Sequence, residues 1–338
     1  MKIQQKADLT LLNTFGVGAT ANQLFAVEDK QDLLELPALV SEQDLVLGGG
    51  SNILLVDDVR GKVVLNRIRG IKLIDEDQGS SLVEVGAGEN WHSLVCHALQ
   101  QGWHGLENLA LIPGLAGAAP IQNIGAYGVE LSELLDSVTA WDWLQSRWVE
   151  FNKQQCELGY RDSIFKRQPR DRYFIISIRL RLKHDFEPRL EYAGLREALA
   201  DQSPSAQNVF ETVVALRLQK LPDPAVQGNV GSFFKNPVLS RQAAEDLLDK
   251  HPELPHWLLP DEQVKLSAAA MIQATGMKGH QRGAAAVSRQ HALVLINRGG
   301  ASGAELWQLA QMVQARVHQQ FDVLLEAEPR IYRHPQQD

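Results

Sequence analysis

The sequence contains few cysteines, no excess of basic residues and no long apolar run. Cys96 and Cys156 are too few for the disulfide framework of a small secreted protein, so a reducing cytoplasm is expected. Asp and Glu outnumber Lys and Arg by 41 to 33, and the net charge of −8 argues against nucleic acid as the main partner. No apolar run approaches the roughly 18 residues of a membrane span, and the N-terminus lacks the apolar core of a secretory signal.

The length and the residue patterns predict an α+β protein with more than one domain. A chain of 338 residues exceeds the roughly 250–300 residues at which a single core stops growing. Strand-like alternation and helical periodicity are mixed, without the strict strand–helix order of a doubly wound sheet. Helices are predicted over residues 30–40 (where Pro37 can interrupt), 91–102, 206–221, 241–250, 264–275 and 301–321. Strands are predicted over 23–29, 61–68, 70–77, 80–90, 137–143, 148–152, 174–183, 291–297 and 322–332, with a strand, a glycine turn and a second strand over 44–58.

Two patterns resemble ligand sites but have the wrong surroundings. Residues 16–21 match G-x-G-x-x-A, yet a strand-like segment follows them, whereas the dinucleotide fingerprint requires a helix there. His92 and Cys96 are four residues apart on a predicted helix, but no further ligands complete a metal site. The sequence therefore predicts a chain turn for the first pattern, an amphipathic helix for the second, and no metal.

Residues 48–52, Gly-Gly-Gly-Ser-Asn, lie between two apolar strands. Glycine lets the backbone approach a diphosphate closely, and successive N–H groups can form an anion-binding nest. A hairpin turn is the alternative. Because turns seldom need three successive glycines, we favour the diphosphate site.

A second glycine-rich stretch, residues 112–128, repeats small residues where a core would need bulky ones. Such a segment can press flat against a planar ring that carries a polyphosphate tail. A long surface loop is the alternative, and loops of this length are commonly functional or disordered. The apolar residues within the stretch argue against disorder.

Three further segments carry candidate chemical groups. Arg161 suits bidentate binding of a carboxylate, although a surface pair with Asp162 is the simpler interpretation. Ser232 follows a glycine and precedes two phenylalanines, and it is either structural or a proton donor. Strand alternation would place Glu326 and Glu328 on one face, either as solvated carboxylates or as a site pair.

Together these motifs resemble one family. LGGGSN, IPGLAGAAPIQNIGAYG, GYRDSIFK, LPDP with GNVGSFFKNP, and LEAEPR occur in the order seen in type I UDP-N-acetylenolpyruvoylglucosamine reductases (MurB). The resemblance extends from Asn13 to Arg330. It implies a flavoprotein of peptidoglycan precursor synthesis with an FAD-binding unit of the vanillyl-alcohol oxidase (PCMH) type. The implied domains are 1–69 and 70–218 for FAD and 219–328 for substrate, with 329–338 returning to the first.

The resemblance also implies ligand-binding residues. FAD would be held by Gly48, Gly50, Ser51, Asn52, Pro113, Gly114, Ala118, Ala119, Ile121 and Gly125. The UDP-sugar would be bound by Tyr127, Tyr192, Lys220, Asn236 and His291. Tyr192 lies in a loop, residues 191–195, that would close over the UDP-sugar in the type I subclass.

The implied reaction has two halves. NADPH reduces the flavin and leaves, and UDP-N-acetylglucosamine enolpyruvate then takes its place and receives the hydride. Arg161 and Glu328 would polarise the substrate carboxylate, and Ser232 would supply a proton. Glu328 would have to be protonated to donate, which implies a raised pKa in a closed site.

Two other functions remain open from the residues alone. An oxidase of the same flavoprotein superfamily would need a His or Cys for covalent flavin attachment, and none can be assigned. A nucleotide-sugar binding protein would not need Arg161, Ser232 and Glu328 together. Pro329 and Ala270 depart from the family pattern, where many relatives carry a β-branched residue and Trp, respectively. We expect a monomer.

Overall fold

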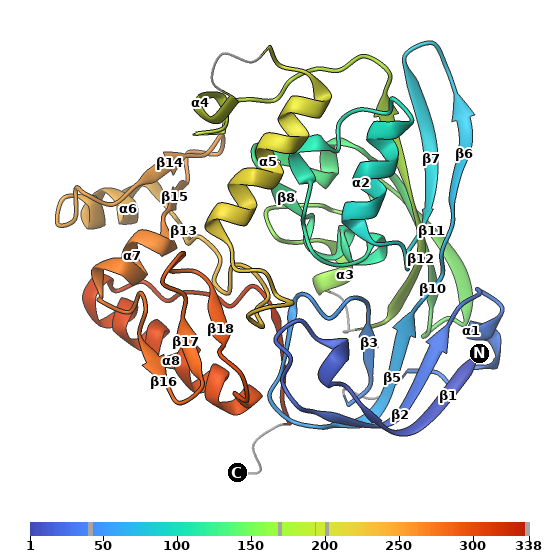
Figure 1. The fold of residues 1–338 in the computed structure, drawn as a ribbon, viewed down its shortest axis with the longest axis horizontal. Coiled ribbons are helices and arrows are strands. Elements are labelled where there is room, and N and C mark those ends of the chain that lie inside the picture. The colour runs from blue at the N-terminus through green and yellow to red at the C-terminus, as the bar shows by residue number, and fades with distance from the viewer. Residues whose placement is uncertain (40–42, 168–170, 193, 200–202, 335–338) are drawn as a thin grey trace. The chain divides into compact units, whose positions relative to one another are not determined.

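A computed structural model describes residues 1–39, 43–167, 171–192, 194–199 and 203–334 (Figure 1). The chain divides into two compact units, each made of segments that are distant in the sequence. The first unit contains residues 1–7, 20–50 and 59–219, and the second contains residues 8–19, 51–58 and 220–338. The mixture of helices and strands confirms the predicted α+β class. The division into three domains stays a prediction.

The first unit contains a four-stranded sheet in which β2 and β3 both pair parallel to β5. In sheet order, the strands are β1 (Lys2–Asp8), β2 (Thr20–Val27), β5 (Val59–Asn66) and β3 (Leu45–Leu47). Of the described residues 30–39, only Asp32–Glu35 form a helix, α1, where a helix is predicted over 30–40, and Val40 lies outside the described residues. Leu36 is extended, because a residue before proline is disfavoured in the helical conformation.

A five-stranded antiparallel sheet is the second sheet of this unit, and it confirms five predicted strands. Its order is β11 (Arg147–Asn152), β10 (Leu135–Asp142), β12 (Tyr173–Lys183), β7 (Ser80–Gly86) and β6 (Ile71–Glu76). The smaller elements of the unit are β8 (Gly125–Ala126), β9 (Val129–Glu130), α3 (Ile164–Arg167) and α4 (Leu195–Leu199).

Two helices cover the five-stranded sheet and close the main core. They are α2 (Trp91–Gln100) and α5 (Ala206–Lys220), which lie on the same side of the sheet in Figure 1. Trp91 and Val213 are fully buried in one cluster with residues of β7, β10 and β12. The Asn90 side chain accepts a hydrogen bond from the Ser93 N–H and so caps the N-terminus of α2. The helix begins where the apolar periodicity predicts. This core is the rigid support on which the glycine-rich stretch lies.

In its described residues, the second unit contains three small sheets and three α-helices. The strands are β13 (Val238–Leu239), β15 (Val264–Leu266) and β14 (His256–Leu258), then β16 (Gln281–Arg282), β17 (Ala285–Val287) and β18 (Leu295–Asn297), and finally β19 (Arg330–Tyr332) beside β4 (Ile53–Leu55). The helices are α6 (Arg241–Leu248), α7 (Ala268–Ala274) and α8 (Gly303–Phe321). β19 pairs parallel to β4, so the end of the chain returns to an N-terminal segment.

Helix α8 begins at a tight contact with β4. Ser302 and Glu305 form a capping box, in which each side chain accepts a backbone N–H of the other residue. A Cβ on Gly303 would lie 1.8 Å from the Leu55 carbonyl oxygen, so only glycine fits there. The predicted apolar face, which includes Leu306 and Val313, is fully buried.

Three predicted boundaries are wrong in this unit. The helix predicted over 264–275 begins only after Ser267, whose hydroxyl caps α7, and the preceding residues form β15. Of the strand predicted over 291–297, only Leu295–Asn297 is regular. Of the strand predicted over 322–332, only β19 is regular, and Ala327 makes an isolated bridge. In the described part of the chain, no helix is long and apolar enough to cross a membrane.

Candidate active site

The two predicted glycine-rich segments contact each other in the first unit. A Cβ on Gly49 would lie 3.2 Å from Gly114 Cα, and a Cβ on Gly48 would lie 3.6 Å from Leu115 Cδ1. Gly114 also has a φ of +122°, which L side chains rarely adopt. The structure therefore joins residues that are more than sixty positions apart in the sequence into one glycine-lined surface.

The second glycine-rich segment is fastened to the core and is not a loose surface loop. It contains the short 3₁₀ turns η3 (Ala116–Ala118) and η4 (Pro120–Gln122). The N–H of Gly117 donates to the Ala87 carbonyl at 2.9 Å, and a Cβ on Gly117 would lie 2.4 Å from Ala87 Cβ. Some N–H groups of this segment are thus used by the protein itself. The predicted residues Pro113, Ala118, Ala119 and Ile121 lie in this segment.

The remaining residues of the first glycine motif fall into the second unit. Ser51 and Asn52 follow the turn and precede β4. The Asn52 carbonyl accepts the Arg330 N–H at 2.9 Å, which continues the pairing of β4 with β19. Gly50 ends the first-unit part of the motif with a φ of +63°.

Arg161 points at the second glycine-rich segment. Its Nη2 donates to the Gly125 carbonyl at 2.9 Å, and its Nη1 lies 3.4 Å from the Asn123 carbonyl. The tight turn that holds it gives Arg161 a φ of +53°. Asp162, the partner of Arg161 in the alternative interpretation, forms an ion pair with Arg167 at 2.9 Å.

Tyr127 and Tyr192 come together from separate loops of the first unit. Their ring centroids are 5.0 Å apart, edge to face. Tyr127 is buried, its carbonyl accepts the Asn108 amide at 2.8 Å, and burial raises the pKa of its hydroxyl. Tyr192 keeps 45% of its surface exposed. Ala193, within the loop predicted to close, lies outside the described residues.

Ser232 and Glu328 belong to neighbouring segments of the second unit. The Glu328 N–H donates to the Phe233 carbonyl at 2.8 Å. The Phe233 N–H donates a hydrogen bond to the Leu293 carbonyl at 2.7 Å, and Ser232 forms an isolated antiparallel β-bridge with Val294. The backbone therefore brings both predicted catalytic residues of this unit to adjacent positions.

Glu326 and Glu328 do not form a carboxylate pair on a regular strand. The segment that contains them has only the single bridge at Ala327. Glu326 is largely exposed and forms an ion pair with Lys235. Pro329 is buried and is the last residue of this irregular segment, because β19 starts at Arg330.

Lys220 and His291 both belong to the second unit, and the charge of Lys220 acts on His291. Burial lowers the pKa of His291, and the charges of Lys220 and Lys278 lower it further. The His291 Nδ1 accepts the Leu293 N–H at 3.3 Å. The Asn236 Oδ1 accepts the Ala268 N–H at 3.1 Å, at the start of α7.

One charged residue of the first unit is not predicted from the sequence. Arg217 lies on α5, and its Nε is buried without a hydrogen-bond partner among the described residues. Tyr127, Tyr192 and Arg161 act on its pKa, which burial lowers. The available signal was an arginine one helical turn after the buried Val213.

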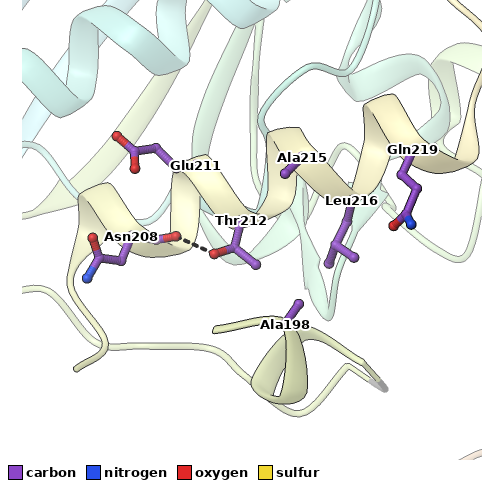
Figure 2. A pocket seen from close by; sticks show the side chains of 7 residues that line it. All are labelled: Ala198, Asn208, Glu211, Thr212, Ala215, Leu216 and Gln219. Carbon is purple, nitrogen blue, oxygen red and sulfur yellow. Dashed lines mark hydrogen bonds between the residues drawn. The ribbon is translucent and has the colours of Figure 1, made fainter. Parts of the chain in front are cut away.

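A cavity of about 500 Å³ lies between α4 and α5, and it contains none of the predicted site residues (Figure 2). Its lining includes Ala198 of α4 and Asn208, Thr212 and Leu216 of α5. The Thr212 hydroxyl donates to the Asn208 carbonyl at 2.7 Å, so this polar group is satisfied within the helix. Nothing about the cavity connects it with the predicted chemistry.

Similarity to known proteins agrees with both units. Residues 21–150 match the FAD binding domain family, which confirms the predicted FAD-binding fold. Residues 223–332 match the family of the C-terminal domain of UDP-N-acetylenolpyruvoylglucosamine reductase. The crystal structure of that reductase (MurB) from Thermus caldophilus superimposes with a TM-score of 0.69 at 24% identity, covering 98% of this chain and 100% of that one. It therefore has the same fold.

Two curated relatives extend the similarity over nearly the whole chain. The UDP-N-acetylenolpyruvoylglucosamine reductase of Neisseria meningitidis serogroup A is 45% identical over 334 residues, which cover 97% of this chain and 96% of the relative. That of Burkholderia lata is 46% identical over 325 residues, which cover 94% of this chain and 93% of the relative. At this identity and coverage, the chain belongs to the UDP-N-acetylenolpyruvoylglucosamine reductase family.

Proposed function

We propose that this protein catalyses the NADPH-dependent reduction of UDP-N-acetylglucosamine enolpyruvate to UDP-N-acetylmuramate, a step of peptidoglycan precursor synthesis. The observation that carries the proposal is the 2.9 Å hydrogen bond from Arg161 Nη2 to the Gly125 carbonyl. This hydrogen bond holds the Arg161 guanidinium, which suits the substrate carboxylate, against the second glycine-rich segment, which suits FAD. Family membership over nearly the whole chain supports the same reaction.

The glycine-lined surface of the first unit fits FAD. The close approach of Gly49 to Gly114 leaves flat backbone where side chains would otherwise stand. The proposed contacts within that surface are Gly48, Gly50, Pro113, Gly114, Ala118, Ala119, Ile121 and Gly125. Ser51 and Asn52, which belong to the second unit, are the other proposed FAD contacts. Bound FAD supplies the hydride acceptor and donor that no side chain provides.

Arg161 and Glu328 are proposed to bind and polarise the substrate carboxylate. Hydride addition to the vinyl carbon leaves an enolate-like charge on the carboxylate side of the substrate. A guanidinium stays charged throughout, and the Gly125 carbonyl holds that of Arg161 in one orientation before the substrate arrives. Glu328 donates a hydrogen bond to the same group when it is protonated.

Ser232 is proposed to deliver the proton that completes the reduction. Its hydroxyl is a weak acid, but the enolate-like carbon is a strong base, so the transfer is downhill. The backbone N–H of Glu328 donates a hydrogen bond to the carbonyl of Phe233, the residue after Ser232. This hydrogen bond fixes the segment that carries Ser232. A serine held in this way delivers its proton in a defined direction.

The UDP part of the substrate is proposed to contact Tyr127, Tyr192, Lys220, Asn236 and His291. Lys220 is exposed at the end of α5, and its ammonium group suits a diphosphate. The partly exposed Tyr192 ring, which packs edge to face against the buried Tyr127, is available to the UDP part of the substrate.

The test is a steady-state assay with chemical analysis of the product. Under anaerobic conditions, purified FAD-loaded protein should oxidise more than one NADPH per flavin only when UDP-N-acetylglucosamine enolpyruvate is present, and the product should be heavier by two hydrogen atoms. Glu328→Gln should lower the rate at least about a hundredfold. Glu326→Gln is the matched control, because Glu326 is largely exposed and pairs with Lys235, and it should leave the rate unchanged. Anaerobic NADPH turnover beyond one equivalent per flavin in the absence of the substrate would contradict the proposal.

We also propose that the protein acts in the cytoplasm, as a monomer and without membrane or nucleic-acid partners. Both cysteines are free thiols, which suits a reducing compartment. The net charge of −8 disfavours nucleic acid. Sedimentation of the purified protein tests the monomer: a single species near 37.5 kDa supports it, and a dimer contradicts it.

A further inference from the structure

The turn that carries Arg161 is closed on itself and has an unusual backbone conformation. The N–H of Gly159 donates to the Asp162 carbonyl at 3.0 Å, and the N–H of Asp162 donates to the Gly159 carbonyl at 3.2 Å. Within this turn, Arg161 has a φ of +53°, which residues with a side chain rarely adopt. Such a conformation persists only where the surrounding contacts over-determine it. The contacts that hold the turn therefore decide where the Arg161 guanidinium lies.

The start of the turn is held by Asn123, a buried residue that follows η4 in the second glycine-rich segment. The Asn123 Nδ2 donates to the Gly159 carbonyl at 3.2 Å and to Glu130 Oε2 at 2.8 Å. The backbone carbonyl of Asn123 lies 3.4 Å from Arg161 Nη1. One asparagine thus ties the first residue of the turn to the segment that the Arg161 guanidinium contacts.

The end of the turn is held by the hydroxyl of Ser163, which is fully buried. Its Oγ donates to the Ile121 carbonyl of η4 at 2.7 Å and accepts the Phe165 N–H of α3 at 3.2 Å. The Phe165 ring packs edge to face against Phe151 of β11 and Tyr173 of β12. A single hydroxyl therefore joins the end of the turn to the second glycine-rich segment and to a helix that rests on the five-stranded sheet.

We propose that Ser163 is a positioning residue for the reaction. Its hydroxyl holds the Arg161 turn against the segment proposed to bind FAD, so that the guanidinium keeps one orientation relative to that segment. This inference rests on the proposed function, which gives Arg161 a substrate carboxylate to polarise. Without the hydroxyl, the turn is released at one end, and ordering the guanidinium becomes part of the cost of stabilising the developing charge.

A purely structural role for Ser163 is the competing explanation, because the same hydroxyl accepts a backbone N–H at the start of α3. The two roles differ in what they change. Loss of a structural contact lowers stability and does not distinguish between the two half-reactions. Loss of a positioning contact slows only the half-reaction that uses Arg161, which is the reduction of the enolpyruvyl substrate. The reduction of the flavin by NADPH is therefore an internal reference.

The experiment is anaerobic stopped-flow absorbance on the FAD-loaded protein. Ser163→Ala, Arg161→Met and the double variant are each bleached with NADPH and then mixed with saturating UDP-N-acetylglucosamine enolpyruvate. Ser163→Ala removes one oxygen atom and adds no bulk to a buried position. Ser302→Ala is the matched control, because the Ser302 hydroxyl also accepts a backbone N–H at 3.2 Å at the start of a helix, in the second unit.

Ser163→Ala should leave bleaching by NADPH unchanged and slow reoxidation by the substrate about 10- to 100-fold, the scale of a misplaced catalytic group. Ser302→Ala should leave both rates unchanged. In the Arg161→Met protein, Ser163→Ala should cause little further loss, because the effects of residues that act as a unit are not additive. This double-mutant comparison shows whether Ser163 acts through Arg161.

Three results would overturn the assignment. The first is unchanged reoxidation in Ser163→Ala. The second is an equal slowing of bleaching and reoxidation, and the third is the same loss of reoxidation rate with and without the Arg161 guanidinium, and either would make Ser163 structural. Failure of the wild-type protein to be reoxidised by the substrate, or full activity of Arg161→Met, would instead count against the proposed function.

Discussion

Ser232 separates the two half-reactions at the scale of a single residue, because the proposed proton transfer belongs to the second half only. Ser232→Ala should leave the bleaching of the flavin by NADPH intact. It should slow reoxidation by the enolpyruvyl substrate by about 10²–10⁴-fold, the usual contribution of a proton donor. Anaerobic stopped-flow absorbance measures both rates in one sample, so the first half-reaction is the internal control. Unchanged reoxidation would remove Ser232 from the mechanism.

His291 predicts a pH dependence of stability. Burial and the charges of Lys220 and Lys278 hold its folded-state pKa below the ordinary value of 6.5. As the pH falls below 6.5, the unfolded chain binds this proton before the folded chain does, so stability is present above 6.5 and is lost on acidification. Each unit of pKa difference corresponds to about 1.4 kcal/mol.

His291→Gln should therefore flatten the fall of Tm with pH below 6.5, measured by thermal unfolding. The side chain of His318 is 56% exposed, so His318→Gln is a suitable control and should change the slope little. An identical slope in His291→Gln and wild type would show that His291 does not carry the effect.

At the residue scale, the sequence predicted groups that stand in motifs and missed a group that depends on packing. Arg161 was found because GYRDSIFK accompanies the glycine-rich motifs. Its bond to Gly125 could not be foreseen, because a turn with a φ of +53° directs the side chain. Arg217 stands in no motif, and only the structure shows that its Nε is buried without a hydrogen-bond partner among the described residues. Burial of that kind is a property of the folded chain alone.

At the scale of elements, Gly117 determines how closely the cofactor-binding segment can approach the sheet. Gly117→Ala would place a Cβ 2.4 Å from that of Ala87, so the segment must shift. We expect a loss of about 1–3 kcal/mol in the free energy of unfolding, measured with urea, together with a lower FAD content. The absorbance ratio of flavin to protein measures that content.

Gly18→Ala is the matched control for this prediction. Its Cβ would meet only Thr10 Oγ1, at 4.0 Å, and its backbone lies outside the left-handed region. The change should be neutral or stabilising by about 0.4–1 kcal/mol. If both variants had equal stability and FAD content, the proposed role of the Gly117 contact would be wrong.

Elements with strong apolar periodicity were predicted well. The apolar stripes of α2 and α8 place those helices correctly, and the structure shows Asn90 and Ser302 as their caps. Errors occur where tertiary contacts decide the conformation. Residues 264–266 have helical composition but pair with two other strands, and the segment before β19 departs from a strand around Pro329. Local propensity is a weak guide in such places.

At the scale of the whole molecule, the ordered set of motifs carried more information than composition or secondary structure. Composition excluded broad classes, and secondary structure supported only an α+β fold. The units that the structure defines combine distant segments, such as 51–58 with 220–338, and no local pattern predicts that grouping. The family, in contrast, followed from motif order and is confirmed by relatives at 45–46% identity.

The most direct test of the central claim is an anaerobic visible spectrum of the purified protein, recorded before and after two additions. The account predicts a yellow flavin spectrum that NADPH bleaches and that UDP-N-acetylglucosamine enolpyruvate then restores. Bleaching without restoration would contradict the proposed substrate. A protein that takes up no flavin, even when FAD is supplied, would contradict the assignment of the glycine-lined surface and with it the proposed function.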